Sequence, residues 1–560
     1  MRKICTLLTL GSIVLGAFLG IIGAPWWLTA LVALAGMIAF LLNARVRGNF
    51  RTVTRPMTLQ REYRAGWFLV GGAVAAGAAS ANVLVIGGSV ALGVGLIFSE
   101  PKLAPKWGAL TPSVRNLPGA QTFGWVRSVV TTFLLLGLVG SFALFLVPAV
   151  GTGMAWVSLG VNLVAAALAA TVTLYAARMR SLVSNRKWEA VAEYCPAFAL
   201  YFSAPAGSAY QVKMWLPFLE RTGLPWVIIL RERRYLNLFA DLTDAPVVVA
   251  SRLSSLDRAL VPSIRAVFYV NNSFKNSHCV RFSDRTHVQL LHGDSDKVAS
   301  FSPVTAMYDR VFVAGRAGQD RYARNGVEIP DEKFRIVGRP QVEGIEREAK
   351  AGATDTQQAP TVLYAPTWQG FQKDANFSSL PRAESIVRAL LGAGCRIIFR
   401  VHPSSLRSSG SAAVIRRVVE ILAEDARHGE DHLFGERAQE EIDLVDCMNL
   451  SDALVTDISS VPGDYLFSEK PFITVKTFDD MPEPEFVQAY PLAGASYIWD
   501  WTRADQLPPI IQEMLGDDPL HAKRSSMRQY YLGDFSSQGY ANHFIDAVRT
   551  VVNENYVVTQ

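Results

Sequence analysis

Three long stretches without a charged residue constrain the fold of this chain most. They span residues 4–44, 65–98 and 128–177. A membrane-spanning helix needs about 20 apolar residues, so each stretch can hold a helical hairpin. Turn-forming residues divide the stretches near Pro25, Ser80 and Gly151. The pattern predicts a membrane region over residues 1–180, with about six spans in three hairpins.

The basic residues between these stretches give a separate indication of topology. Arginines and lysines precede the first predicted span and follow the second, fourth and sixth, whereas the three turns inside the hairpins carry no charge. The positive-inside rule places such segments in the cytoplasm. We therefore expect both termini, and everything after Arg178, to be cytoplasmic. The alternative for residues 1–24 is a cleaved signal peptide, because Arg2 and Lys3 precede an apolar run.

Composition narrows the class of protein further. A mean hydropathy of +0.20 with 18% charged residues fits a membrane region joined to a soluble region. The net charge of +5 is small for 560 residues, which argues against a nucleic-acid partner. The five cysteines form no C-x-x-C pair, so neither a disulfide framework nor a zinc ribbon is expected. Since the uncharged stretches lack the ionisable groups of a transport pathway, an anchor is favoured over a transporter.

After about residue 187 the pattern changes to short apolar runs that alternate with amphipathic helices. A polar, small-residue segment at 346–360 reads as a linker between two such regions, at 190–345 and 361–556. This alternation predicts two α/β domains, each with a parallel, doubly wound sheet. The expected strands are 198–202, 226–230, 247–250, 266–270, 288–291 and 311–314 in the first domain, and 362–365, 395–401, 453–456 and 471–475 in the second.

Polar clusters follow the strongest predicted strands, at residues 292–297, 367–369, 400–403 and 457–460. Ligands of doubly wound sheets bind at these carboxyl ends. Asp457 and the two serines after it precede a helix start near Val461, which is a suitable phosphate site, although a plain helix cap is the alternative. Arg400 and His402 add cationic donors suited to a diphosphate, unless His402 is merely solvated. Standard Gly-rich nucleotide signatures are absent.

Taken together, these residues resemble the CDP-glycerol glycerophosphotransferase family, whose members build teichoic-acid-type polymers. The resemblance covers about residues 198–475 and lies in five pieces in the family's order. They are His292 and Gly293 with Lys297; Gly338, Arg339 and Pro340; residues 363–368; residues 400–403; and residues 451–460 with Asp464 and Tyr465.

The resemblance implies a GT-B-like pair of Rossmann-type domains. It implies that an acceptor hydroxyl attacks the β-phosphorus of CDP-glycerol or a related CDP-alcohol, releasing CMP. The acceptor would be a lipid-linked polymer at a bacterial-type inner membrane, in contact with membrane lipid, and no cofactor or metal is expected. The catalytic residues would be His292, as general base, and His402. The donor-binding residues would be Arg400, Thr456, Asp457, Ser459, Ser460, Thr367, Gly293 and Lys297.

Departures from the family pattern at Gln341, Gln369 and Ile458 leave the alcohol and the polymer open. Asp294 and Asp296 form a D-x-D, which in a metal-dependent glycosyltransferase would hold a divalent cation; helix capping is the alternative. His428 and His432 are spaced as a metal pair would be on a helix, but their neighbours favour a solvated loop. A catalytically decayed membrane scaffold and a transporter with a regulatory nucleotide domain are further alternatives.

Overall fold

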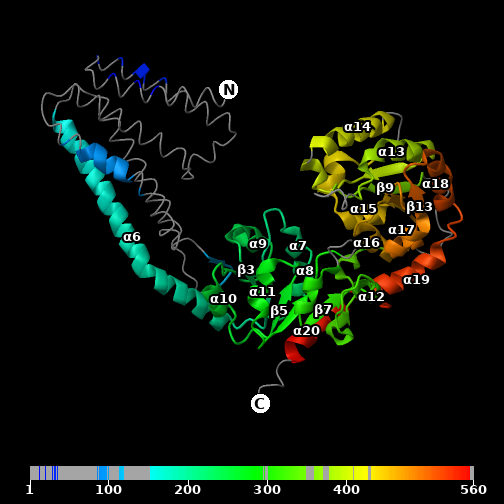
Figure 1. The fold of residues 1–560 in the computed structure, drawn as a ribbon, viewed down its shortest axis with the longest axis horizontal. Coiled ribbons are helices and arrows are strands. Elements are labelled where there is room, and N and C mark those ends of the chain that lie inside the picture. The colour runs from blue at the N-terminus through cyan, green and yellow to red at the C-terminus, as the bar shows by residue number, and fades with distance from the viewer. Residues whose placement is uncertain are drawn as a thin grey trace. The chain divides into compact units, whose positions relative to one another are not determined.

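The computed structural model describes residues 152–293, 296, 301–347, 359–369, 377–407, 409–426 and 431–554, the segments 88–96 and 113–118, and single residues between 12 and 99. The chain divides into two compact units. The first comprises Met1–Val114 and Pro118–Ala190, and the second comprises Arg115–Leu117 and Val191–Gln560. Each is described by itself (Figure 1).

The main described element of the first unit is α6, a 43-residue helix from Thr152 to Tyr194. Within it, Leu159–Arg178 is long and apolar enough to cross a membrane, and it is the one such helix in the described part of the chain. This segment corresponds to the sixth predicted span. The other five predicted spans lie wholly or mainly outside the described residues, so the six-span arrangement stays a prediction. The helix does not end at the basic residues after Arg178 but continues through them.

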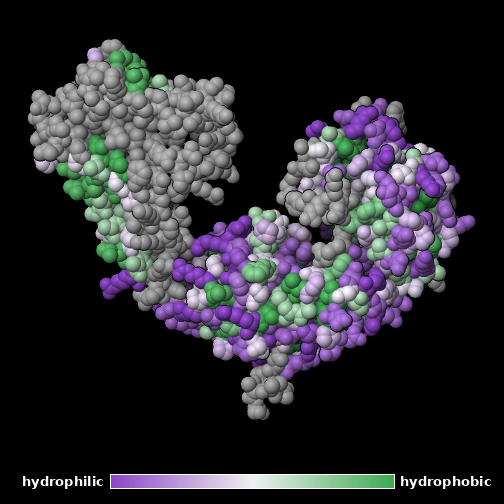
Figure 2. All heavy atoms as spheres, in the orientation of Figure 1, coloured by the Kyte–Doolittle hydropathy of each residue, from purple (hydrophilic) through white to green (hydrophobic). Residues whose placement is uncertain are grey.

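In the apolar part of α6, before Arg178, large apolar side chains are exposed and the buried side chains are small. Asn162 is buried and donates from Nδ2 to Ser89 Oγ at 2.9 Å, which joins α6 to the helical segment 88–96. Small residues and an interhelical hydrogen bond are typical of packed membrane helices. Figure 2 shows hydrophobic residues gathered along the exposed part of α6. The exposed set is Trp156, Val157, Leu163, Val164, Leu174 and Tyr175, and the buried alanines are Ala165, Ala169 and Ala176.

The second unit contains two parallel sheets. The first has eight strands among the described residues, in the order β1-β4-β3-β2-β5-β6-β7-β8, and the pairs from β2 to β8 are all parallel. Counted from β2, this is the doubly wound order of a Rossmann fold, with its topological switch point between β2 and β5. The strands are β1 Val114–Arg115, β2 Phe198–Phe202, β3 Trp226–Leu230, β4 Val247–Val249, β5 Ala266–Tyr269, β6 Thr286–Gln289, β7 Arg310–Val313 and β8 Phe334–Ile336.

Short helices connect these strands, as right-handed crossovers between parallel strands require. The α-helices of this domain are α7 Tyr210–Lys213, α8 Leu216–Glu220, α9 Leu236–Ala240, α10 Leu253–Ala259, α11 Ser277–Val280 and α12 Arg316–Arg324.

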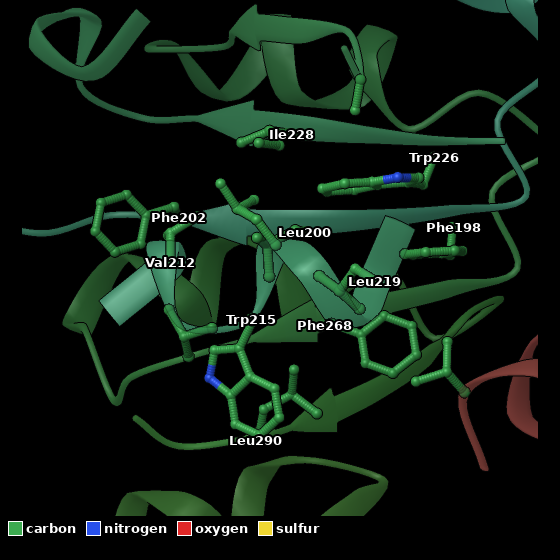
Figure 3. Close-up of a cluster of buried hydrophobic side chains, with 14 of the residues drawn as sticks. Phe198, Leu200, Phe202, Val212, Trp215, Leu219, Trp226, Ile228, Phe268 and Leu290 are labelled. Atoms are coloured by element: carbon green, nitrogen blue, oxygen red, sulfur yellow. The ribbon is translucent and has the colours of Figure 1, made fainter. Parts of the chain in front are cut away.

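The core of the first domain forms because the strands are apolar on both faces, as expected for a sheet covered on both sides. β2 and β3 are buried along their whole length. Figure 3 shows Trp215 and Trp226 packed with Phe198 and Phe268 in this core. The C-terminal helix α20, Asn542–Glu554, contributes to the same cluster, so the end of the chain packs on the first domain.

The second sheet is also parallel, in the order β10-β9-β11-β12-β13. This is the other common doubly wound order, and its switch point lies between β9 and β11. The strands are β9 Thr361–Ala365, β10 Arg396–Phe399, β11 Ala453–Thr456, β12 Phe472–Lys476 and β13 Tyr497–Asp500. The helices are α13 Ala383–Gly392, α14 Ser409–Asp425, α15 Leu444–Leu450, α16 Val461–Tyr465, α17 Glu483–Ala489, α18 Leu507–Leu515 and α19 His521–Leu532, with a π-helical turn at Arg437–Glu441.

A further apolar cluster joins elements of both domains. Ala314 and Ala317, after β7, pack with Tyr531 of α19 and with Leu363 of β9. The backbone of α19 approaches Gly315 so closely that a Cβ there would lie 2.5 Å from the Tyr530 carbonyl oxygen. The approach requires glycine, because any side chain would collide with main-chain atoms.

These observations confirm the predicted fold class of the soluble part, a GT-B-like pair of Rossmann-type domains. The predicted domain boundaries, at 1–180, 190–345 and 361–556, stay predictions. Two elements pack outside the range that contains them: α20, in the last range, packs on the core of the first domain, and β1, in the first range, joins the first sheet.

Candidate active site

His292 lies just beyond the carboxyl end of β6. The preceding residue, Leu291, has a left-handed φ of 59°, which is uncommon for a leucine. Two hydrogen bonds hold it there: its N–H donates to Gln289 Oε1, and its carbonyl accepts from Trp215 Nε1, both at 2.9 Å. Strained backbone of this kind persists only where neighbours hold it, and it is frequent at functional sites. The sharp turn directs the chain so that His292 reaches the end of β5.

The hydrogen bonds of the His292 ring identify its tautomer. Its Nδ1 lies 2.7 Å from the carbonyl oxygen of Val270, and its Nε2 lies 3.3 Å from Gln211 Nε2. A carbonyl can only accept, so Nδ1 carries the proton and Nε2 accepts from the Gln211 amide. The nitrogen that can take up a proton is therefore Nε2, and the Gln211 amide occupies its lone pair in this structure.

Electrostatics favour the neutral form of this ring. Burial lowers the pKa of His292 below its ordinary value, and the positive charge of Arg339 lowers it further, while the Val270 carbonyl acts in the opposite direction. A neutral imidazole with an exposed lone pair near pH 7 can accept a proton from a hydroxyl. The arrangement suits a general base.

Arg339 connects this histidine to the second domain. Its side chain is buried and forms a two-pronged ion pair with Asp464 of α16, through Nε to Oδ1 and through Nη2 to Oδ2 at 3.1 Å. The residue also lines a small cavity together with Gly293, Trp215 and Gly338. Bidentate pairs of this type fix geometry as well as charge. Arg339 and Asp464 belong to two motifs of the family resemblance that are far apart in the sequence.

The second sheet brings two of the predicted strand-end clusters together at its switch point. Thr367 follows β9, and Asp457, Ser459 and Ser460 follow β11, which is hydrogen-bonded to β9. Helix α16 begins at Val461, the predicted position.

Asp457 and Thr456, predicted to bind the donor, are scaffold residues in the structure. Both are fully buried. The Asp457 carboxylate accepts from Thr367 N at 3.0 Å and from both N and Oγ of Ser379 at 2.8 and 3.0 Å, and Thr456 Oγ1 donates to Ala365 O. A carboxylate so placed would also repel a phosphate. Their observed contacts shape the loop after β9, and their direct contact with the donor stays a prediction.

Ser459 and Ser460 are half-buried at the start of α16. Ser459 Oγ accepts from Val461 N at 3.3 Å. Ser460 occupies the N-cap position but makes no side-chain capping bond. The plain capping role therefore does not account for the Ser460 hydroxyl, and its role in donor binding stays a prediction.

Arg400 and His402 lie close in sequence but have different surroundings. Arg400 Nη1 donates to the carbonyls of Ala438 and Ile442, the latter at 2.6 Å, and so holds the π-helical turn. His402 is exposed, its Nδ1 accepts from Ser404 N at 3.1 Å, and its ring stacks near Trp368 at 6.1 Å. In its neutral form His402 therefore presents a protonated Nε2, a suitable phosphate donor. These contacts of Arg400 use Nη1, and its predicted contact with the diphosphate stays a prediction.

The alternative metal sites are not supported by the described residues. Asp296 of the D-x-D pairs with the buried Arg321 at 3.0 Å and accepts from Tyr531 at 2.9 Å, while Asp294 and Lys297 lie outside the described residues. His432 is buried, bonded to Ile397 N and Asp425, so the prediction of a solvated loop is wrong for it. No group of three metal-binding side chains occurs in the described part of the chain.

Sequence reasoning missed three contributors to the site. Gln211, on α7, accepts from Asn271, which follows β5, and neither residue stands in a recognisable pattern. Arg339 belongs to the Gly338–Pro340 piece of the family resemblance, but the sequence analysis assigns it no function. The sequence feature that could have indicated a function is an arginine directly after Gly338.

Comparison with known proteins defines the class. Residues 255–480 match the model of the family described as CDP-Glycerol:Poly(glycerophosphate) glycerophosphotransferase. The match is to less than half of the chain, but it contains both His292 and the Ser459–Ser460 pair. It supports a CDP-glycerol glycerophosphotransferase-like transferase as the class of enzyme. No curated protein sequence matches the chain.

Solved structures offer only distant similarities. The wall teichoic acid polymerase TagF is 13% identical with a TM-score of 0.42, over 68% of this chain and 96% of TagF. MnaA of S. aureus, determined with UDP, is 13% identical with a TM-score of 0.41, over 63% and 96%. A UDP-N-acetylglucosamine 2-epimerase is 14% identical with a TM-score of 0.40, over 65% and 97%. At these scores the similarities do not establish a shared activity.

Proposed function

We propose that this chain is a membrane-anchored glycerophosphotransferase that moves glycerol phosphate from CDP-glycerol to a hydroxyl of a lipid-linked cell-envelope polymer and releases CMP. The observation that carries the proposal is the half-buried His292, whose hydrogen bonds leave Nε2 as the proton acceptor and which lies within the segment matched by the family model. The donor identity comes from that family. The departures at Gln341, Gln369 and Ile458 leave a related CDP-alcohol as the finer alternative.

The proposed reaction is a single displacement at phosphorus. The acceptor hydroxyl oxygen bonds to the β-phosphorus of CDP-glycerol, and the bond from that phosphorus to the bridging oxygen breaks. CMP leaves with the bonding electron pair, and the hydroxyl proton passes to His292 Nε2. Because such transfers depend mostly on positioning and charge stabilisation, His402 Nε2–H and the Ser459 and Ser460 hydroxyls are proposed to bind the phosphate oxygens.

The assay for this proposal is nucleotide release by detergent-purified protein with membrane extract as acceptor source. We expect CMP from CDP-glycerol and no UDP from a UDP-sugar. Release of UDP with no CMP would show that the enzyme is a glycosyltransferase and would contradict the proposal. Parallel reactions with CDP-ribitol test the finer choice of alcohol.

The proposed location is the inner membrane with the transferase domains in the cytoplasm. The support is the one-sided distribution of basic segments and the apolar helix Leu159–Arg178. An anchored enzyme would meet a membrane-bound acceptor at high effective concentration.

Cys195, at the end of α6, allows this location to be tested. It is exposed, whereas Cys279, Cys395 and Cys447 are buried. In a Cys5→Ser background, we expect a membrane-impermeant maleimide to label the protein only after the inner membrane is opened. Labelling of spheroplasts with an intact inner membrane would contradict the cytoplasmic placement.

A further inference from the structure

Gln211, on α7, makes the hydrogen bond that occupies the Nε2 lone pair of His292. We propose that Gln211 is a positioning residue that holds His292 neutral with its proton on Nδ1, until an acceptor hydroxyl replaces the Gln211 amide at Nε2. The catalytic part of this inference rests on the proposed function. The effect of Gln211 on the protonation of His292 does not, and can be measured without any substrate.

The Gln211 amide cannot reverse its two ends freely. Asn271 Nδ2 donates to Gln211 Oε1 at 2.8 Å, which leaves the Gln211 NH₂ group directed at His292. Asn271 is itself fixed, because its Oδ1 accepts from Ser273 N at 3.0 Å and its Nδ2 also lies 3.3 Å from Ser203 O. The hydrogen bonds thus form a directed series from the ends of β2 and β5 to the histidine.

This series opposes protonation of the ring. An imidazolium carries N–H on both nitrogens, so its Nε2–H would face the Gln211 NH₂ group, donor against donor. Reversal of the amide would instead bring the Gln211 NH₂ group against the Asn271 NH₂ group. The other groups that face His292 from the described elements are Tyr210, whose ring lies edge-on at 5.9 Å, and Arg339, whose charge also disfavours the cation. No described carboxylate acts on His292, and the amide orientation adds to burial and to the Arg339 charge in favouring the neutral form.

Substitution of Gln211 by Glu reverses the preference with almost no change of shape. A carboxylate accepts from Nε2–H, so we expect the pKa of His292 to rise. The measurement is the rate of carbethoxylation of His292 by diethyl pyrocarbonate as a function of pH, followed by peptide mass spectrometry of the full-length protein. Only the neutral imidazole reacts. At a pH below the wild-type midpoint we expect about tenfold slower modification in Gln211→Glu, because the neutral fraction falls tenfold for each unit of pKa.

Two further variants complete the test. Gln529→Glu, exposed on α19, adds the same charge elsewhere and should leave the His292 profile unchanged. Gln211→Met removes both amide groups and should move the profile in the same direction as Gln211→Glu, but less. The inference is overturned if the pH profiles of His292 carbethoxylation coincide for wild type and Gln211→Glu while the circular dichroism spectra are unchanged. A shifted profile in a protein that releases no CMP would instead keep the inference and reject the proposed function.

Discussion

His292→Ala is expected to lower CMP release by about 10²- to 10⁴-fold, the usual contribution of a positioned general base. Binding of CDP-glycerol should change little, because the His292 contacts lie within the first domain, at Val270 and Gln211. The measurement pairs steady-state CMP release with calorimetric titration of the nucleotide. Added imidazole should restore part of the activity by entering the space left by the ring.

The pH dependence adds a second test of the same residue. The active form is the neutral base, and burial lowers its pKa. The rate should therefore rise with pH and level off below the pH at which an ordinary histidine would titrate. His543→Ala, a change at an exposed histidine of α20, is the control and should leave the rate unaltered. CMP release near the wild-type rate in His292→Ala would exclude His292 as the general base.

Asp457→Ala is expected to destabilise the second domain rather than simply weaken donor binding. The change leaves the N–H groups of Thr367 and Ser379 without their buried acceptor, whereas the Ser379 hydroxyl keeps Tyr364 as a partner. Unpaired buried donors cost about 1–3 kcal/mol each, so a loss of roughly 2–6 kcal/mol in the free energy of unfolding is expected from these two groups. Thermal or urea unfolding of the purified protein measures it.

Ser460→Ala is the matched comparison at the same loop. Its hydroxyl makes no capping bond, so stability should change by no more than about 0.5 kcal/mol, whereas the KM for CDP-glycerol should rise. Together the two variants distinguish a residue that supports the loop from a residue that contacts the donor. If the Asp457→Ala protein unfolds like wild type but no longer binds nucleotide, Asp457 contacts the donor directly.

The regular parts of the fold were predictable because strands of parallel sheets are continuous apolar runs. β2, β3 and β11 begin and end where the sequence places them. β8 and β13 were missed because they are short or alternate with charged and polar residues at the sheet edges. The packing of α20 on the first core could not be predicted, since an amphipathic helix does not specify which apolar surface covers it.

The candidate site was predictable to the level of strand ends, but not of side-chain direction. The sequence correctly places polar clusters after β9 and β11. It cannot indicate that Arg400 turns to the carbonyls of Ala438 and Ile442, or that Asp457 points into the protein, because these depend on segments far along the chain. Likewise, a basic residue such as Arg178 predicts where a membrane span ends, but the helix itself continues to Tyr194.

The proposed reaction breaks the bond between the β-phosphorus and the bridging oxygen. The most direct measurement uses CDP-glycerol labelled with ¹⁴C in the glycerol and ³²P at the β-phosphorus. We expect both labels to enter the polymer in equal amounts and unlabelled CMP to be released. Entry of ¹⁴C alone, with ³²P retained in released CDP, would show transfer of glycerol without its phosphate and would rule out the proposed reaction.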